Sequence, residues 1–206
     1  MTKADLKKTI AAYTAPRGSF EIIDVPPMQY LMIDGHGDPN TSEDYAAAVA
    51  AVFGVAYKLK FLSKVELGLD YVVMPLEGLW WSDDMATFTS ERDKSRWCWT
   101  MMSLIPDWIE GGHVDAAREA ALAKGGSPAI DRLRHEVLTE GECVQTLHVG
   151  SYDDEAAVLE EMHHRFIPES GLRMRGRHHE VYLADPRRTA PERLRTILRQ
   201  PVEPAS

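Results

Sequence analysis

The sequence predicts an α+β protein built from two consecutive strand-helix-strand-strand units. Three observations lead to this prediction. Short runs rich in β-branched and aromatic residues alternate with segments of helical periodicity. Glycine and proline pairs separate these runs. One pattern, a strand followed by a glycine turn, a serine or threonine, acidic residues and a helix, occurs once in each half of the chain.

Five elements are expected in the first unit, residues 20–106, which follows an N-terminal extension of residues 1–19. They are two strands, a helix and two strands, over residues 20–25, 29–34, 38–62, 70–81 and 95–106. Pro26-Pro27 separates the first two strands, because a proline pair marks a bend or a sheet edge. Thr41 is the candidate N-cap of the helix, with an acidic residue three positions later. A polar connection over residues 82–94 joins the last two strands.

A connecting helix is expected over residues 107–126, where a glycine pair ends it. The second unit, residues 127–206, then contains a strand, a helix, a strand and a short final helix, over residues 142–150, 155–167, 177–186 and 189–202. Ser151 is the candidate cap of the first of these helices. The final helix is expected because proline stands near its start and just after its end.

The two halves share a pattern. MQYLMIDGHGDPNTSEDYAAAV in the first half matches CVQTLHVGSYDDEAAVLEEM in the second as strand, glycine turn, cap, acidic residues and helix. This match predicts a duplicated unit with pseudo-twofold symmetry, in which antiparallel sheets have helices on one side. The other side is expected to hold a central ligand cleft, since binding sites often form where two such units meet.

Composition limits the class of protein. The chain has 206 residues, of which 44% are hydrophobic and 27% charged, as in folded globular proteins. The net charge of −9 opposes general affinity for nucleic acid, and no uninterrupted apolar run reaches the ~18 residues that span a membrane. Cys98 and Cys143 are the two cysteines. They suggest neither a disulfide framework nor a zinc cluster, so we expect a cytoplasmic protein without metal or cofactor.

A carboxylate stands in the middle of the strand RHHEVYLADP. Side chains alternate along a strand, so His178, Glu180 and Tyr182 share one face, and Val181 and Leu183 share the other. A lone glutamate there is most often solvated. If Val181 and Leu183 pack under the helices instead, Glu180 faces the expected cleft.

The five tryptophans all lie between Trp80 and Trp108. A single tryptophan most often fills a core, but the clustering also fits an aromatic wall that accepts flat ligands. Trp97, Trp99 and Met101 alternate on one strand face, and which of the two faces lines the cleft stays open. We therefore expect a set of ligand-binding residues in and opposite these strands: Trp80, Trp97, Trp99, Met101, Met74, Val72 and His178. Val72 and Met74 belong to this ligand-binding set because aligning the strands of the two halves places them opposite Glu180 and Tyr182.

Three segments carry a resemblance to a known family: YLMIDGHGDPN, DYVVMPLEGLWW and RHHEVYLADPRRTAPERLRTILRQPV. Together they resemble the GyrI-like small-molecule-binding domains, over about residues 20–202. The nearest subgroup is the stand-alone bacterial one, which includes the cyclopropanoid cyclopropyl hydrolases. The resemblance implies the duplicated strand-helix-strand-strand (SHS2) fold and a buried glutamate in a central pocket, at the position of Glu180.

The resemblance also implies a function. It suggests a protein that binds hydrophobic planar small molecules, contributes to detoxification, and hydrolyses a cyclopropane-bearing natural product with Glu180 as general base. In that reaction negative charge would develop on a carbonyl oxygen of the substrate. Tyr182, on the same strand face as Glu180, is the first candidate to donate a hydrogen bond to it, and His178 is the second. The alternatives are a non-catalytic multidrug-binding or sequestering protein and a protein-protein modulator such as a gyrase inhibitor. Whether the chain is an enzyme, and in what oligomeric state it acts, stays open at this point.

Overall fold

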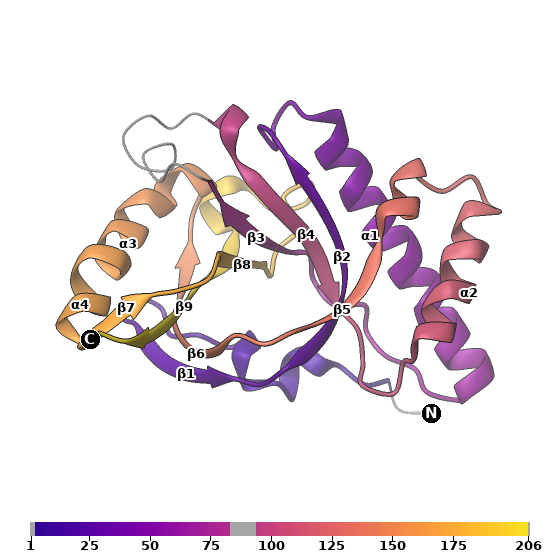
Figure 1. Ribbon diagram of the computed structural model, residues 1–206, viewed down its shortest axis with the longest axis horizontal. Coiled ribbons are helices and arrows are strands. Elements are labelled where there is room, and N and C mark those ends of the chain that lie inside the picture. The colour runs from indigo at the N-terminus through magenta and orange to yellow at the C-terminus, as the bar shows by residue number, and fades with distance from the viewer. Residues whose placement is uncertain (1–2, 83–93, 206) are drawn as a thin grey trace. The chain divides into compact units, whose positions relative to one another are not determined.

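A computed structural model describes residues 3–82 and 94–205 of the chain (Figure 1). The polar connection expected over residues 82–94 lies, apart from its two ends, outside the described residues. Contacts within the chain divide it into two compact units. Unit 1 contains Met1–Thr9 and Met28–Leu138, and unit 2 contains Ile10–Pro27 and Thr139–Ser206.

The described residues of unit 1 form a four-stranded antiparallel sheet with two α-helices. Its strands are β2 (Met28–His36), β3 (Glu77–Trp81), β4 (Cys98–Leu104) and β5 (Arg134–Leu138), in the spatial order β3-β4-β2-β5. Its helices are α1 (Glu43–Leu62) and α2 (Gly111–Leu122). Helix α1 packs on β2, β4 and α2.

Unit 2 has the same kind of architecture. Its strands are β1 (Glu21–Val25), β6 (Gly141–Val149), β7 (Leu172–Met174), β8 (His178–Tyr182) and β9 (Arg195–Pro204), in the order β1-β6-β9-β8 with β7 paired to β9. Helix α3 (Glu155–Glu161) continues through a π-helical turn (Met162–Phe166) into α4 (Ile167–Glu169).

The α+β fold and the repeated strand-helix-strand-strand topology are confirmed. In each unit the strand before the helix pairs with the last strand of the repeat, and this last strand also pairs with the strand after the helix. The order of hydrogen-bonded strands is therefore β2-β4-β3 in unit 1 and β6-β9-β8 in unit 2. The pseudo-twofold relation between the units, and a cleft between them, stay predictions.

The expected final helix over residues 189–202 is wrong. Only a single 3-10 turn forms there (Pro191–Arg193), and the rest becomes strand β9. Strand β9 pairs with β6 on one side and β8 on the other, so it is the central strand of unit 2. The fold overrides the helix signal because both faces of this segment are buried: Leu198 lies on one face and Ile197 on the other, and both are fully inaccessible.

Both helix caps differ from expectation. Helix α1 begins one residue later than expected, because the Ser42 hydroxyl, rather than that of Thr41, accepts the Tyr45 N–H at 3.2 Å. In unit 2 the Ser151 hydroxyl donates to the Asp154 carboxylate at 2.7 Å and caps no helix. A 3-10 turn separates it from the first residue of α3, which is Glu155.

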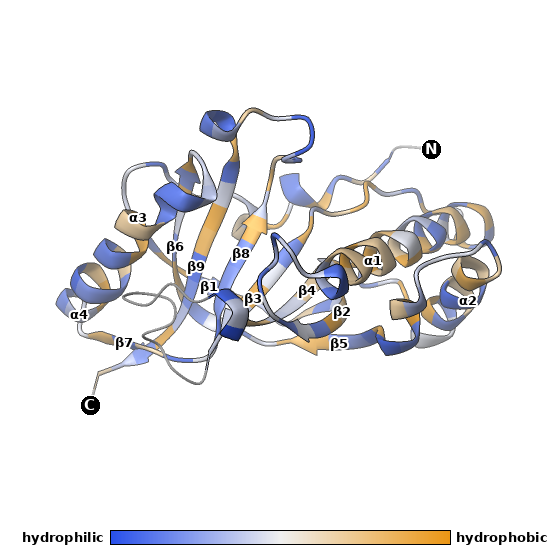
Figure 2. Ribbon diagram, turned by 90° about the horizontal axis from the view of Figure 1, so that it is seen from above, coloured by the Kyte–Doolittle hydropathy of each residue, from blue (hydrophilic) through white to orange (hydrophobic). Residues whose placement is uncertain are grey.

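Helix α1 is the most hydrophobic helix of unit 1 (Figure 2). With the turn that follows it, residues 43–67, it is long and apolar enough to cross a membrane by length and composition alone. Small residues on one side of it are fully buried in unit 1, namely Ala48, Ala51, Val52, Val55 and Ala56. This packing is that of a core helix.

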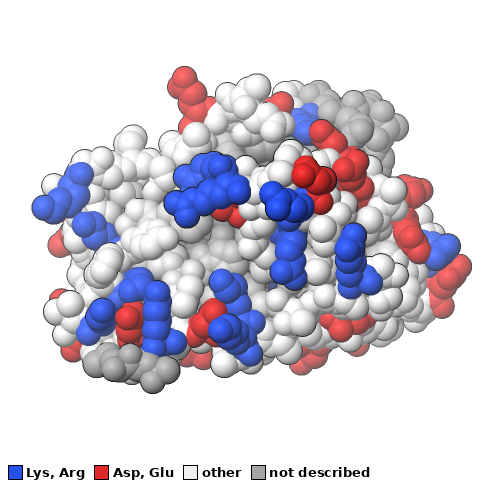
Figure 3. Space-filling view, turned by 180° about the vertical axis from the view of Figure 1, so that it is seen from behind, with Lys and Arg blue, Asp and Glu red and all other residues white. Residues whose placement is uncertain are grey.

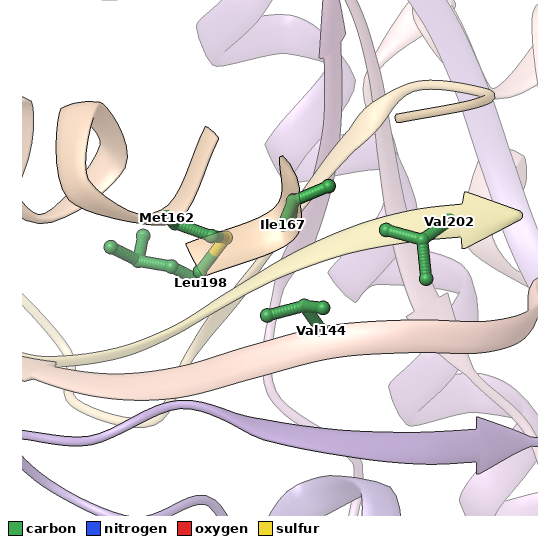
Figure 4. Packing of buried hydrophobic residues seen from close by; sticks show 5 residues of the cluster. All are labelled: Val144, Met162, Ile167, Leu198 and Val202. Atoms are coloured by element: carbon green, nitrogen blue, oxygen red, sulfur yellow. The ribbon is translucent and has the colours of Figure 1, made fainter. Parts of the chain in front are cut away.

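The core of unit 2 lies between the sheet and the helix that starts with α3. Met162 and Ile167 of the helix pack on Val144 of β6 and on Leu198 and Val202 of β9 (Figure 4). Each of these five side chains is at most 1% exposed. Burying side chains of this size contributes about 1.5–3 kcal/mol each to folding, so this cluster fixes the helix on its sheet.

Charged groups of both signs occupy the surface. Lys and Arg side chains are prominent on the face shown in Figure 3, despite the negative net charge. Several arginines of the C-terminal third form exposed ion pairs, for example Arg173 with Glu203 at 2.7 Å. Arg199 differs from these, since its side chain is completely buried.

Candidate functional site

Glu180 lies on the helix-covered face of the unit 2 sheet. In the β8–β9 pairing Glu180 is opposite Leu198, and paired residues point to the same face. Leu198 belongs to the core cluster beneath the helix. The expectation that Val181 packs under the helix is therefore wrong: Val181 is opposite Ile197, on the other face. Both faces of this sheet are buried there, so apolar alternation could not identify the helix side.

The Glu180 carboxylate has two neighbours on its own strand. The Tyr182 hydroxyl donates to its Oε2 at 2.7 Å, and the His178 Nε2 lies 3.7 Å from its Oε1. The Glu180 side chain is only 14% exposed. Burial raises its pKa to about 7, although the Tyr182 hydrogen bond and the charge of His179 act in the opposite direction. Near neutral pH this carboxylate therefore gains and loses a proton.

Glu155 is a second carboxyl group in this cluster, and sequence reasoning missed it. It is the first residue of α3 and is 4% exposed. Burial, together with the negative charge of Glu180, raises its pKa to about 10. Its Oε1 has no hydrogen-bond partner among the described residues. Glu155 is thus a neutral acid at pH 7, beside a carboxylate that titrates.

Two histidines border the same cluster. The rings of His163 and His178 are 5.7 Å apart and nearly perpendicular. Burial lowers the pKa of both, that of His163 to about 4, so both rings are neutral at pH 7. Both ring nitrogens of His178 are buried, and neither makes a hydrogen bond within the described chain. His178 therefore holds a buried N–H close to Glu180.

Aromatic side chains form a group of their own in unit 1. Trp80 and Trp97 meet edge to face with ring centroids 5.7 Å apart. Tyr45 of α1, which sequence reasoning missed, stacks on Trp80 at 6.3 Å and meets Trp99 edge-on at 5.3 Å. Trp80 is 6% exposed and Trp99 is fully buried, as is the neighbouring Met101. Trp80 and Trp99 thus both contact one helical tyrosine, and Trp97 contacts Trp80.

Gly35 makes room for this aromatic group. It is paired with Trp99 across the β2–β4 ladder. A Cβ atom at this position would lie 2.1–2.6 Å from atoms of the Trp99 ring, closer than any van der Waals contact. The indole N–H of Trp99 donates to the Gly37 carbonyl at 3.2 Å. The glycine turn therefore fixes the orientation of Trp99.

The expected alignment of Val72 and Met74 with Glu180 is wrong. The strand predicted over residues 70–81 forms only at Glu77–Trp81, so neither residue belongs to a strand. Met74 is buried, and its carbonyl accepts a hydrogen bond from the Ser103 hydroxyl. In the repeated topology, strand β3 of unit 1 corresponds to strand β8 of unit 2, because each pairs with the last strand of its repeat.

The opposite face of β8 carries a buried ionic network. His179 Nδ1 lies 3.0 Å from both carboxylate oxygens of Glu140, and Arg199 Nη1 lies 3.1 Å from one of them. Arg199 also donates to Gln145 at 3.1 Å and to the Ala12 carbonyl. Burial alone would raise the pKa of Glu140, but the charges and hydrogen bonds of His179 and Arg199 lower it to about 2. This network fixes the back of the strand that carries Glu180.

Comparison with known proteins identifies the family. Residues 19–203 match the model of the GyrI-like small molecule binding domain. Two solved structures from Listeria innocua, an uncharacterized conserved protein and a hydrolase, are each 38% identical over 98% of this chain and 100% of theirs, with TM-scores of 0.89 and 0.86. The C-terminal domain of EcmrR is 10% identical over 91% of this chain and 98% of its own, with a TM-score of 0.55, and shows the fold alone. No curated protein matches the sequence. The chain belongs to the GyrI-like family of small-molecule-binding domains.

Proposed function

We propose that this protein hydrolyses a hydrophobic, planar electrophile that carries a strained cyclopropane ring, with Glu180 as the general base. The observation that carries the proposal is the state of Glu180: a nearly buried carboxylate with a pKa of about 7, held by the Tyr182 hydroxyl at 2.7 Å. A general base works best when its pKa is close to the working pH. The similarity to a Listeria innocua hydrolase over almost the whole chain supports the same reaction class.

The reaction adds one water molecule to the substrate. Glu180 takes a proton from water while the water oxygen forms a bond to a ring carbon of the cyclopropane. We take the cyclopropane of the substrate to be conjugated to a dienone. The ring carbon–carbon bond breaks, and its electron pair moves through the dienone to the carbonyl oxygen, which becomes a phenolate. A proton then neutralises the phenolate, and a hydrogen-bond donor close to this oxygen stabilises the transition state.

Glu180 and its neighbours divide the tasks. The Tyr182 hydroxyl already donates to Glu180, so we assign it the orientation of the base. His178 is neutral and has no hydrogen-bond partner among the described residues, so we assign it the hydrogen bond to the developing phenolate. Glu155, protonated at neutral pH, keeps the cluster at no more than one negative charge. A low charge of this kind favours a neutral substrate over an anionic one.

Binding without turnover is the second candidate function. A buried carboxyl cluster also pairs with a cationic drug, because an opposite charge stabilises the ionised form of both glutamates. In that case the protein would sequester its ligand at one molecule per site.

Mass spectrometry of the substrate separates the two functions. A cyclopropane-bearing DNA alkylator is incubated with protein at one hundredth of its molar concentration. We expect all of the alkylator to gain the mass of one water molecule. The product must form many times over per protein molecule, because a base that is regenerated acts repeatedly. An unchanged mass, with protection from alkylation only at equimolar protein, would establish sequestration and contradict the proposal.

A further inference from the structure

Unit 2 contains a cavity of about 490 Å³ that none of the residues around Glu180 line. Its walls are residues 17–20, the end of β6 from Thr146 to Val149, and one side of the helix from Val158 to Phe166. Pockets for small organic ligands typically measure about 300–1,000 Å³. The cavity is therefore large enough for a ligand of two or three rings.

A strand and an apolar core separate this cavity from Glu180. In the sheet register, Glu180 is opposite Leu198, and Leu198 is opposite Thr146, so the three lie in a row on one face. Leu198, the middle member, packs with Met162 of the helix (Figure 4). The cavity and the carboxyl cluster thus lie on opposite flanks of the same helix, within unit 2.

Hydrogen bonds hold the cavity wall in place. The Leu147 N–H donates to the Pro16 carbonyl at 2.8 Å, and the Thr146 hydroxyl donates to the Ser19 carbonyl at 2.8 Å. Hydrogen bonds near both ends of residues 17–20 therefore fix this wall to the end of β6. A cavity with a fixed wall is formed before a ligand arrives, which lowers the entropic cost of binding.

The cavity has an aromatic end and a cationic rim. The rings of Phe20 and Phe166 are 5.1 Å apart and tilted by 41°. Arg165 is neutralised by Glu161 at 2.5 Å. Arg17 is exposed and forms no ion pair with any described residue. The rim therefore has one uncompensated guanidinium, in a protein whose net charge is −9.

We propose that this cavity is a second ligand site, which binds a small organic anion with a flat apolar body. A carboxylate or sulfonate would pair with Arg17, whose planar fork matches such groups. The apolar body would lie along Phe20 and Phe166. The Glu180 cluster lacks such a cation, and Glu180 repels the same ligands when it is ionised. The proposal goes beyond the proposed hydrolysis and does not depend on it.

Two matched dyes test the site. We expect 8-anilinonaphthalene-1-sulfonate to bind with enhanced fluorescence, and Arg17→Glu to weaken its binding about tenfold or more, since a charged hydrogen bond contributes about 1.5–3 kcal/mol. The uncharged N-phenyl-1-naphthylamine should bind wild type and Arg17→Glu equally. Arg193→Glu is the matched control, because Arg193 is an exposed arginine of unit 2 outside the cavity.

Several outcomes would overturn the proposal. One is absence of sulfonate-dye binding to wild type, and another is equal weakening by Arg17→Glu and Arg193→Glu. A third is tighter binding of the dye to Glu180→Gln, which would place the sulfonate beside that carboxylate. Thermal unfolding of each variant excludes misfolding. Arg17→Gln, which removes the charge without reversing it, gives a smaller loss in the same direction and repeats the test if Arg17→Glu fails to fold.

Discussion

Glu180→Gln is expected to reduce hydrolysis by a factor on the order of 10² or more, the usual scale for a positioned general base. Glutamine keeps the size of the side chain and still accepts the Tyr182 hydrogen bond, but it takes no proton from water. Folding should be unaffected, because the neutral amide removes a charge that burial disfavours. The measurement is the turnover rate of the cyclopropane-bearing alkylator at saturating substrate.

The binding of a neutral planar ligand is the control for this variant. If Glu180 is only a base, the dissociation constant of a neutral ligand stays the same while turnover falls. If Glu180 only pairs with cations, the affinity for a cationic ligand falls instead. Full activity of Glu180→Gln would remove the carboxylate from the mechanism.

Glu140→Gln is expected to destabilise the protein by about 3–5 kcal/mol, as other changes do that break one side of a buried ionic group. His179 and Arg199 are both fully inaccessible, and the Glu140 carboxylate compensates them. The neutral amide would remove the carboxylate charge that both of them face. Chemical denaturation at pH 7 measures the free energy of unfolding.

An exposed pair supplies the matched control. Glu203 lies 2.7 Å from Arg173 in the same unit, with side chains that are 40% and 60% exposed. Glu203→Gln should cost less than about 1 kcal/mol, because solvent screens the pair. Equal losses from both variants would contradict the importance of the buried network.

The stability difference between wild type and Glu140→Gln depends on pH, because the pKa of Glu140 is lowered in the folded protein. Its folded-state pKa of about 2 is below the ordinary 4.5, so its contribution to stability is complete above about pH 5. The contribution is lost as pH falls through 4.5 toward 2. The gap between wild type and Glu140→Gln should close over that range.

Sequence reasoning predicts much of the fold because the repeated signals are local. A glycine turn, a serine or threonine, acidic residues and a helix follow one another in each half, and the same topology results in both units. The last strand, β9, could not be predicted in this way. Its flanking prolines and its arginines fit a helix, and only its two neighbours in the sheet make it a strand.

The candidate site could be predicted only in part. Glu180, Tyr182 and His178 follow from strand alternation, and the structure brings them together. Glu155 has no distinguishing sequence signal, since it follows Asp153 and Asp154 in an acidic helix start of a common kind. Its burial depends on how the helix packs on the sheet. The burial of Arg199 has no local sequence signal either, because a buried arginine requires partners that are distant in the sequence, here Glu140 and Gln145.

The most direct test of the central claim, that Glu180 acts as a base with a pKa near 7, is the pH profile of kcat/KM for the alkylator. A base must be deprotonated to act, so its activity is lost below its pKa. We expect kcat/KM to rise about tenfold per pH unit up to about pH 7 and to level off above it. The inflection should be absent from the residual activity of Glu180→Gln. A flat wild-type profile between about pH 5 and 9, or the same inflection in Glu180→Gln, would contradict the account.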